Sequence, residues 1–215
     1  AAFIPSYAGE LEQNKEKAGE FAKNVFNLLL LVLLILVLLA EVFMPQLIFL
    51  IAPGFYSDTE KLNLAIDLSR ITFPFLFFIS LASFFSAVLN SHNKFAASAA
   101  APIILNVVLI ISLLISQFIS MSEVLILSYA VSFSGILQLL VLFFLAKDKL
   151  NLNINFKFKI DAKVKFFFKK LLPSIFSSGV TQINILVGTI IASFQAGAVS
   201  YLYYADRIYQ INLAV

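Results

Sequence analysis

The run LLLLVLLILVLLA, residues 28–40, contains only Leu, Val, Ile and Ala. Its flanks extend it into an apolar stretch from Val25 to about Ile51. This is longer than the roughly 20 residues that a helix needs to span the hydrocarbon core of a bilayer. Backbone N–H and C=O groups in hydrocarbon must find partners within the segment, and a helix provides them. The stretch therefore predicts a transmembrane helix.

The rest of the chain has the same character. Hydrophobic residues make up 61% of the 215 residues and charged residues 13%, whereas a soluble domain carries roughly a quarter charged residues. Five further apolar segments follow, at about 68–90, 95–118, 124–146, 171–194 and 198–215. Pro74 lies inside the first of these and predicts a kink. We expect an all-α, polytopic membrane protein with six spans.

Lysine and arginine are concentrated in alternate loops. One set of loops and flanks carries twelve such residues, including Lys15, Lys94 and eight lysines between residues 147 and 170. The other set carries two, Lys61 and Arg70. Because short loops rich in lysine and arginine stay in the cytoplasm, residue 1 is predicted to lie on the cytoplasmic side.

The long basic loop has a pattern of its own. Apolar and polar residues alternate from Leu150 to Ile160, which predicts an extended segment with one apolar face. Asp161 is suited to cap a helix, and apolar residues at helical spacing follow it beside several lysines. We expect an amphipathic element at the cytoplasmic headgroups. It serves either as a positive anchor alone or as an attractor of anionic lipid headgroups.

The fifth apolar segment carries an unusual number of polar residues. They fall on one helical face or next to it, and those expected to line a cavity are Ser177, Thr181, Gln182 and Asn184. Polar side chains in a membrane are costly unless they face protein or water, so this face predicts a wet cavity. Close packing of small residues between helices is the alternative, which fits Ser better than it fits the two amides.

The sixth segment contains the sequence Tyr203-Tyr204-Ala205-Asp206-Arg207. Arg207 lies nine residues after Ala198, which places it about 13 Å into a helix. Tyr203, Arg207 and Gln210 share a helical face, and a guanidinium offers forked donors suited to phosphate. An arginine at this depth is usually functional. The alternative is a structural pair with Asp206 or with another helix, although neighbouring residues point about 100° apart on a helix.

Several kinds of site are excluded or not expected. The chain has no Cys and a single His, His92, so it has no disulfide and no thiolate ligand, and a His-rich zinc site or a Ser-His-Asp triad is not expected. A membrane enzyme acting on polyprenyl phosphate would need clustered acidic residues or histidines, and only Asp206 lies deep in a span. No nucleotide-binding loop is visible. We expect no enzyme activity, no metal, no cofactor and no nucleic-acid partner.

Short motifs along the whole chain resemble those of the MviN/MurJ family of bacterial lipid II flippases, in the family's order. They are AFIPSYA (2–8), APGF (52–55), ITFPF (71–75), LNSHNKF (89–95), APIILN (101–106), GILQLL (135–140), ASF (192–194) and YYADR (203–207). Each motif alone is weak. Together, ITFPF, LNSHNKF and YYADR are specific.

The resemblance implies a fold of fourteen transmembrane helices in two lobes, shared with multidrug, oligosaccharidyl-lipid and polysaccharide exporters. This chain would supply helices three to eight. Residues 1–146 would belong to the N-terminal lobe, 147–170 would form a cytoplasmic linker, and 171–215 would begin the C-terminal lobe. A start at AAFIPSYAGE without Met and an end inside an apolar run also suggest a piece of a longer protein.

The resemblance further implies a function. The family carries lipid II, an undecaprenyl-pyrophosphate-linked precursor, from the cytoplasmic to the outer leaflet of the bacterial inner membrane by alternating access. Arg207 matches a cavity arginine thought to meet the pyrophosphate, and Asp206 matches its acidic neighbour. The expected partners are therefore lipid II, membrane lipids and the rest of the polypeptide. A polysaccharide-unit or drug exporter of the same fold, or a non-transporting membrane fragment, remains the alternative.

Overall fold

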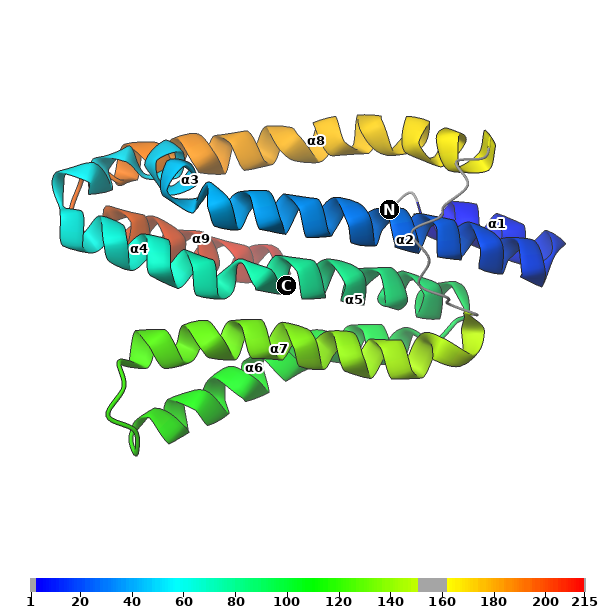
Figure 1. The fold of residues 1–215 in the computed structure, drawn as a ribbon, viewed down its shortest axis with the longest axis horizontal. Coiled ribbons are helices and arrows are strands. Elements are labelled where there is room, and N and C mark those ends of the chain that lie inside the picture. The colour runs from blue at the N-terminus through cyan, green and yellow to red at the C-terminus, as the bar shows by residue number, and fades with distance from the viewer. Residues whose placement is uncertain (1–2, 151–161, 215) are drawn as a thin grey trace.

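The computed structural model describes residues 3–150 and 162–214. Within these ranges the regular structure is helical, as expected for an all-α protein, and Figure 1 shows the helices in chain order. The elements are α1 (Phe3–Gln13), α2 (Lys15–Val42), α3 (Met44–Ile51), the 3-10 helix η1 (Pro53–Ser57), α4 (Thr59–Thr72), α5 (Pro74–Ser91), α6 (Phe95–Ser116), α7 (Glu123–Ala146), the 3-10 helix η2 (Lys147–Lys149), α8 (Ala162–Ala192) and α9 (Ala198–Ala214).

Four helical segments among the described residues are long and apolar enough to cross a membrane. They are Lys15–Val42, Thr59–Ser91, Phe95–Ser116 and Glu123–Lys149. These confirm the first four predicted spans. α8 and α9 lie where the fifth and sixth spans were expected, and the described part of α8 contains a shorter apolar stretch, Gln182–Ala192. That these two helices cross the bilayer stays a prediction.

The predicted bounds of the first span were wrong at both ends. α2 begins ten residues earlier, because the Asn14 side-chain oxygen accepts hydrogen bonds from the amides of Glu16 (2.8 Å) and Lys17 (3.3 Å) and so caps a charged first turn. It ends at Val42, and a separate helix starts at Met44. Pro45 has no N–H to continue the ladder, so the chain turns there.

The second span is two helices joined at a proline, which confirms the predicted kink. α4 ends at Thr72, α5 begins at Pro74, and Phe73 lies between them. The segment starts earlier than predicted, at Thr59, where the Asp58 carboxylate accepts a hydrogen bond from the Lys61 amide at 3.1 Å. Its 33 residues correspond to about 50 Å of helix, against about 30 Å of hydrocarbon.

The bundle packs around α5, which lies against α2 on one side and α7 on the other (Figure 1). Phenylalanine rings fill the interface: Phe26 meets Phe85 at 5.5 Å between ring centroids, and Phe85 meets Phe143 of α7, also at 5.5 Å. Gly135 lets α7 approach α5 closely, since a Cβ there would lie 2.8 Å from the Phe75 ring. α5 is therefore the centre of residues 3–150.

The Asp161 cap and the alternating segment 150–160 lie outside the described residues, apart from Leu150. α8 begins at Ala162 and continues through most of the fifth predicted span as one 31-residue helix. The lysine-flanked residues 162–170 form the first turns of α8, and their place at the cytoplasmic headgroups stays a prediction.

Candidate functional site

α9 carries the candidate substrate site. It starts after a turn at residues 193–197, in which Gly197 has φ +74°, a conformation that residues with a side chain rarely adopt. The turn reverses the chain, so that α9 packs back against α8, where Leu202 lies 3.5 Å from the Cβ position of Gly188. Arg207 is nine residues into α9, or about 13 Å along the helix axis.

The four residues proposed for substrate binding form one connected group. The Arg207 Nη1 donates a hydrogen bond to the Gln210 side-chain oxygen at 3.0 Å, and the Gln210 Nε2 donates to the Asp206 carboxylate at 2.6 Å. The Arg207 guanidinium lies over the Tyr203 ring, 4.8 Å from its centroid. Gln210 therefore links two charged neighbours whose own side chains diverge on the helix.

This arrangement leaves the guanidinium able to bind an anion. Tyr203 is 55% exposed, and Asp206, Arg207 and Gln210 are also exposed. Arginine has five N–H donors, and the bond to Gln210 occupies one of them. The remaining donors match the forked geometry of phosphate oxygens. Gln210 also engages the Asp206 carboxylate, which orients that negative charge along the helix.

The expected cavity residues of α8 are placed only in part. Gln182 and Asn184 are exposed, whereas the side chains of Ser177 and Thr181 lie outside what the structure describes. Asn184 is one turn before Gly188, which faces α9, so Asn184 is on the α9 side of the helix. Gln182 is two residues from Asn184 and points to a different side. No hydrogen bond between described residues joins either amide to the Arg207 group.

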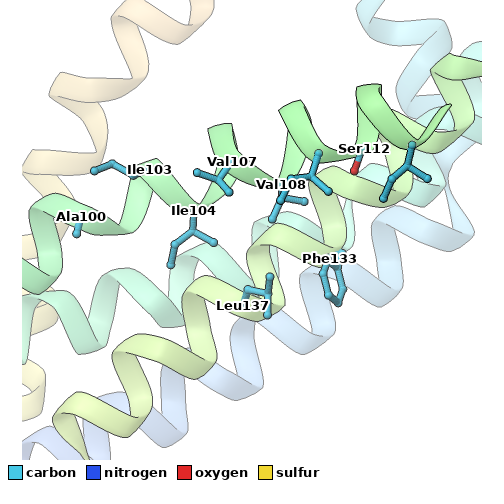
Figure 2. A pocket seen from close by; sticks show the side chains of 10 residues that line it. Ala100, Ile103, Ile104, Val107, Val108, Ser112, Phe133 and Leu137 are labelled. Atoms are coloured by element: carbon cyan, nitrogen blue, oxygen red, sulfur yellow. The ribbon is translucent and has the colours of Figure 1, made fainter. Parts of the chain in front are cut away.

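An apolar groove between α6 and α7 was not foreseen from the sequence (Figure 2). It has a volume of about 610 Å³ and is lined by Ala100, Ile103, Ile104, Val107, Val108, Ile111, Ser112, Ile115, Phe133 and Leu137. Only Ser112 is polar among them. The groove can accept an apolar chain but has no charged side chain to bind a diphosphate. It is therefore not an alternative to Arg207 as the anion-binding site.

Two amide side chains are buried in the bundle: Gln138, within the GILQLL motif, and Asn27, which the sequence patterns did not single out. Asn27 of α2 is 2% exposed and Gln138 of α7 is 1% exposed. Both nitrogens lack a hydrogen-bond partner within the described part of the chain, as does the Asn27 oxygen. Asn27 immediately precedes the aliphatic run, and a polar residue next to such a run is the signal that could have identified it.

At the end of the bundle that holds α3, η1 contacts the turn that follows α8. The Gly54 amide in η1 donates a hydrogen bond to the Ser193 hydroxyl at 3.0 Å, and that hydroxyl donates to the Ile190 carbonyl at 2.7 Å. A Cβ on Gly54 would overlap the backbone carbonyl of Ser193. Only glycine fits this approach, and Ser193 is 3% exposed as a result.

A family model described as "Lipid II flippase MurJ" matches residues 1–215, the whole chain. The chain belongs to the MurJ family. A relative from Rickettsia prowazekii (strain Madrid E), named a probable lipid II flippase MurJ, is 42% identical over 216 residues, which cover 100% of this chain and 42% of that protein. One of the same name from Rhizobium tropici is 38% identical over 220 residues, covering 100% of this chain and 41% of the relative.

A solved MurJ structure agrees with this assignment. The chain aligns with "Lipid II flippase MurJ, inward closed conformation" at a TM-score of 0.76 and 30% identity, over 98% of this chain and 43% of that one. The all-α membrane fold expected from the motifs is thereby confirmed. This chain spans about two fifths of the length of the MurJ relatives that it matches.

Proposed function

We propose that the protein to which these residues belong flips lipid II from the cytoplasmic to the outer leaflet of the bacterial inner membrane. The match of the MurJ family model to all 215 residues carries this proposal. The arginine group on α9 supports it, because a fixed cation on a membrane helix suits a lipid-linked diphosphate.

The proposed mechanism involves no covalent chemistry. Arg207 binds the diphosphate through its free donors while Tyr203 supports the guanidinium face, worth about 0.5–1 kcal/mol at an exposed site. Gln210 fixes the rotamer of Arg207 and holds Asp206 aside. Asn184 and Gln182, with Ser177 and Thr181, extend the polar surface along α8.

Transport by alternating access then requires two lobes. We assign residues 1–146 to the N-terminal lobe, 147–170 to a cytoplasmic linker and 171–215 to the start of the C-terminal lobe. Under this assignment the Gly54–Ser193 contact joins the two lobes at the end of the bundle predicted to face outward. Release of substrate to the outer leaflet separates these two residues.

Complementation tests the substrate role. The full-length protein should restore growth of a bacterium depleted of its flippase, Arg207→Ala should not, and Arg207→Lys should rescue weakly, because an ammonium keeps the charge but loses the fork. Tyr209→Phe, an exposed change on the same helix outside the group, is the matched control. Full rescue by Arg207→Ala would exclude the diphosphate role. Failure of the wild type, despite normal insertion, would count against lipid II as the substrate.

A further inference from the structure

A polar recess lies at the lysine-rich end of the bundle, where α2 begins and α7 ends. It has a volume of about 790 Å³, within the range of roughly 300–1,000 Å³ typical of ligand pockets. The lining residues are Lys15, Glu16, Gly19, Glu20, Lys23, Lys147, Asp148, Lys149 and Leu150. The space beside Gly19 is open, since a Cβ there would meet nothing within 4 Å.

The cationic groups of this recess are available to a ligand. Four lysines face three carboxylates, and no ion pair forms among them in the part of the chain that the structure describes. Lys147 lies over the Phe144 ring, 5.5 Å from its centroid, which keeps its ammonium beside the recess without neutralising it. Lys15, Lys147 and Lys149 are exposed and Lys23 is half-buried.

His92 lies near the lysines of the recess. His92, in the turn between α5 and α6, accepts or donates a hydrogen bond at 3.1 Å with the buried hydroxyl of Tyr7. Burial, followed by the positive charges of Lys149, Lys15 and Lys94, holds the pKa of His92 below its usual range. Lys149 and Lys15 of the recess thus lie near enough to His92 to disfavour its protonated form, as a smaller effect than burial.

The position of the recess along α2 indicates which layer of the bilayer lies beside it. The apolar stretch begins at Val25, so Lys23 stands about 3 Å before the hydrocarbon and Lys15 about 15 Å before it, at helical rise. Headgroups occupy roughly the 5–8 Å outside the hydrocarbon on each side of a bilayer. Lys23 is thus at phosphate level and Lys15 reaches the aqueous side. Leu150, 5% exposed, supplies an apolar floor.

We propose that this recess binds a phosphate group, carried by an anionic phospholipid or present as free phosphate, at a site separate from Arg207. Lys23 contacts the phosphate while Lys15, Lys147 and Lys149 surround the polar end. The Asn14 side chain already caps the amides of Glu16 and Lys17, so the lysines and not the helix end provide the binding. The site is independent of the proposed transport of lipid II.

Native mass spectrometry of the full-length protein in detergent tests the proposal. The probes are phosphatidylglycerol, phosphatidylcholine as the neutral lipid, and inorganic phosphate. The variant is Lys15→Gln/Lys149→Gln, and the control is Lys17→Gln/Lys169→Gln, which removes two exposed charges outside the recess. Retention of phosphatidylglycerol should fall about 25-fold in the variant, at roughly fivefold per lysine, and stay unchanged in the control.

Each outcome is decisive. Binding of phosphatidylglycerol that millimolar phosphate does not displace identifies a lipid site, whereas displacement identifies a site for the phosphate group alone. Equal losses in the variant and the control would mean general attraction to a basic surface and would overturn the proposal. Unchanged binding in the variant, or equal retention of both lipids by the wild type, would overturn it as well. Circular dichroism verifies that both variants remain helical.

Discussion

Replacing Gly54 with alanine should open the contact between η1 and the end of α8. The added methyl group would overlap the Ser193 carbonyl, so η1 and α8 must move apart. Overpacking of this kind costs about 1–3 kcal/mol. Loss of the bond between the Gly54 amide and the Ser193 hydroxyl removes about 1 kcal/mol more. The closed contact is thus weakened by about 2–4 kcal/mol, a shift of about 25- to 700-fold in its population.

Distances between spin labels measure this shift. Labels placed at the exposed Tyr56 and Gln195, in a full-length protein with no other cysteine, report on the two sides of the contact. The label distance should increase in Gly54→Ala. Ser193→Ala removes the hydrogen bond without the overlap, so its increase should be smaller.

Gly179→Ala is the matched control for this experiment. It makes the same substitution in α8 at a position where a Cβ meets nothing within 4 Å. We expect no change in the label distance and a gain in helix stability of about 1 kcal/mol. If Gly54→Ala leaves the distance as in the wild type, or if Gly179→Ala lengthens it equally, the contact does not hold the two segments together.

Three further predictions concern single side chains. Gln210→Leu should lower complementation severalfold without changing expression, because its bonds to Arg207 and Asp206 are lost; full activity would show that the amide positions nothing. Gly135→Ala should lower the melting temperature, at a cost of about 1–3 kcal/mol, since its Cβ would lie 2.8 Å from a phenylalanine ring of α5; an unchanged melting temperature would contradict the close packing. The pKa of His92 is held below its usual range in the folded protein, so the unfolded chain binds a proton at this histidine more readily. The free energy of unfolding that this histidine contributes is therefore fully present above about pH 6.5, and it should be lost as the pH falls through the pKa of the folded state. Melting temperatures at pH 5 and 7.5 should differ less in His92→Gln than in the wild type, and equal pH dependence would contradict this.

Local sequence patterns predicted the helices well. The aliphatic run at 28–40 predicted a transmembrane helix, and Pro74 predicted a break in the backbone hydrogen bonds of the second span. The four residues of the arginine group, Tyr203, Asp206, Arg207 and Gln210, lie close together in the sequence of one helix, so helical geometry alone brought them together. Features that depend on a few adjacent residues could therefore be read from the chain.

Features that join distant segments could not be predicted. Gly54 and Ser193 are 139 residues apart, and Tyr7 and His92 are 85 apart. Nothing in either local sequence specifies its partner, because these contacts follow from how whole helices pack. The start of α2 was missed for a different reason: the hydropathy of Lys15 to Lys23 is low, while the Asn14 cap and tertiary packing make this segment helical.

The sparse packing of α6 has a consequence for how the sequence can vary. Only 6% of its most apolar stretch is buried, and Ile110 and Leu114 are each 58% exposed. Where these positions face acyl chains, which accept any aliphatic shape, exchanges among Leu, Ile, Val and Phe cost little, whereas a charge costs about 2.5–3.5 kcal/mol. We expect the residue types on the outer face of α6 to vary among aliphatic side chains of different shape while the hydropathy of this face is kept. Gly54 and Gly135 have the opposite constraint, since the backbone or ring beside each leaves no room for another atom.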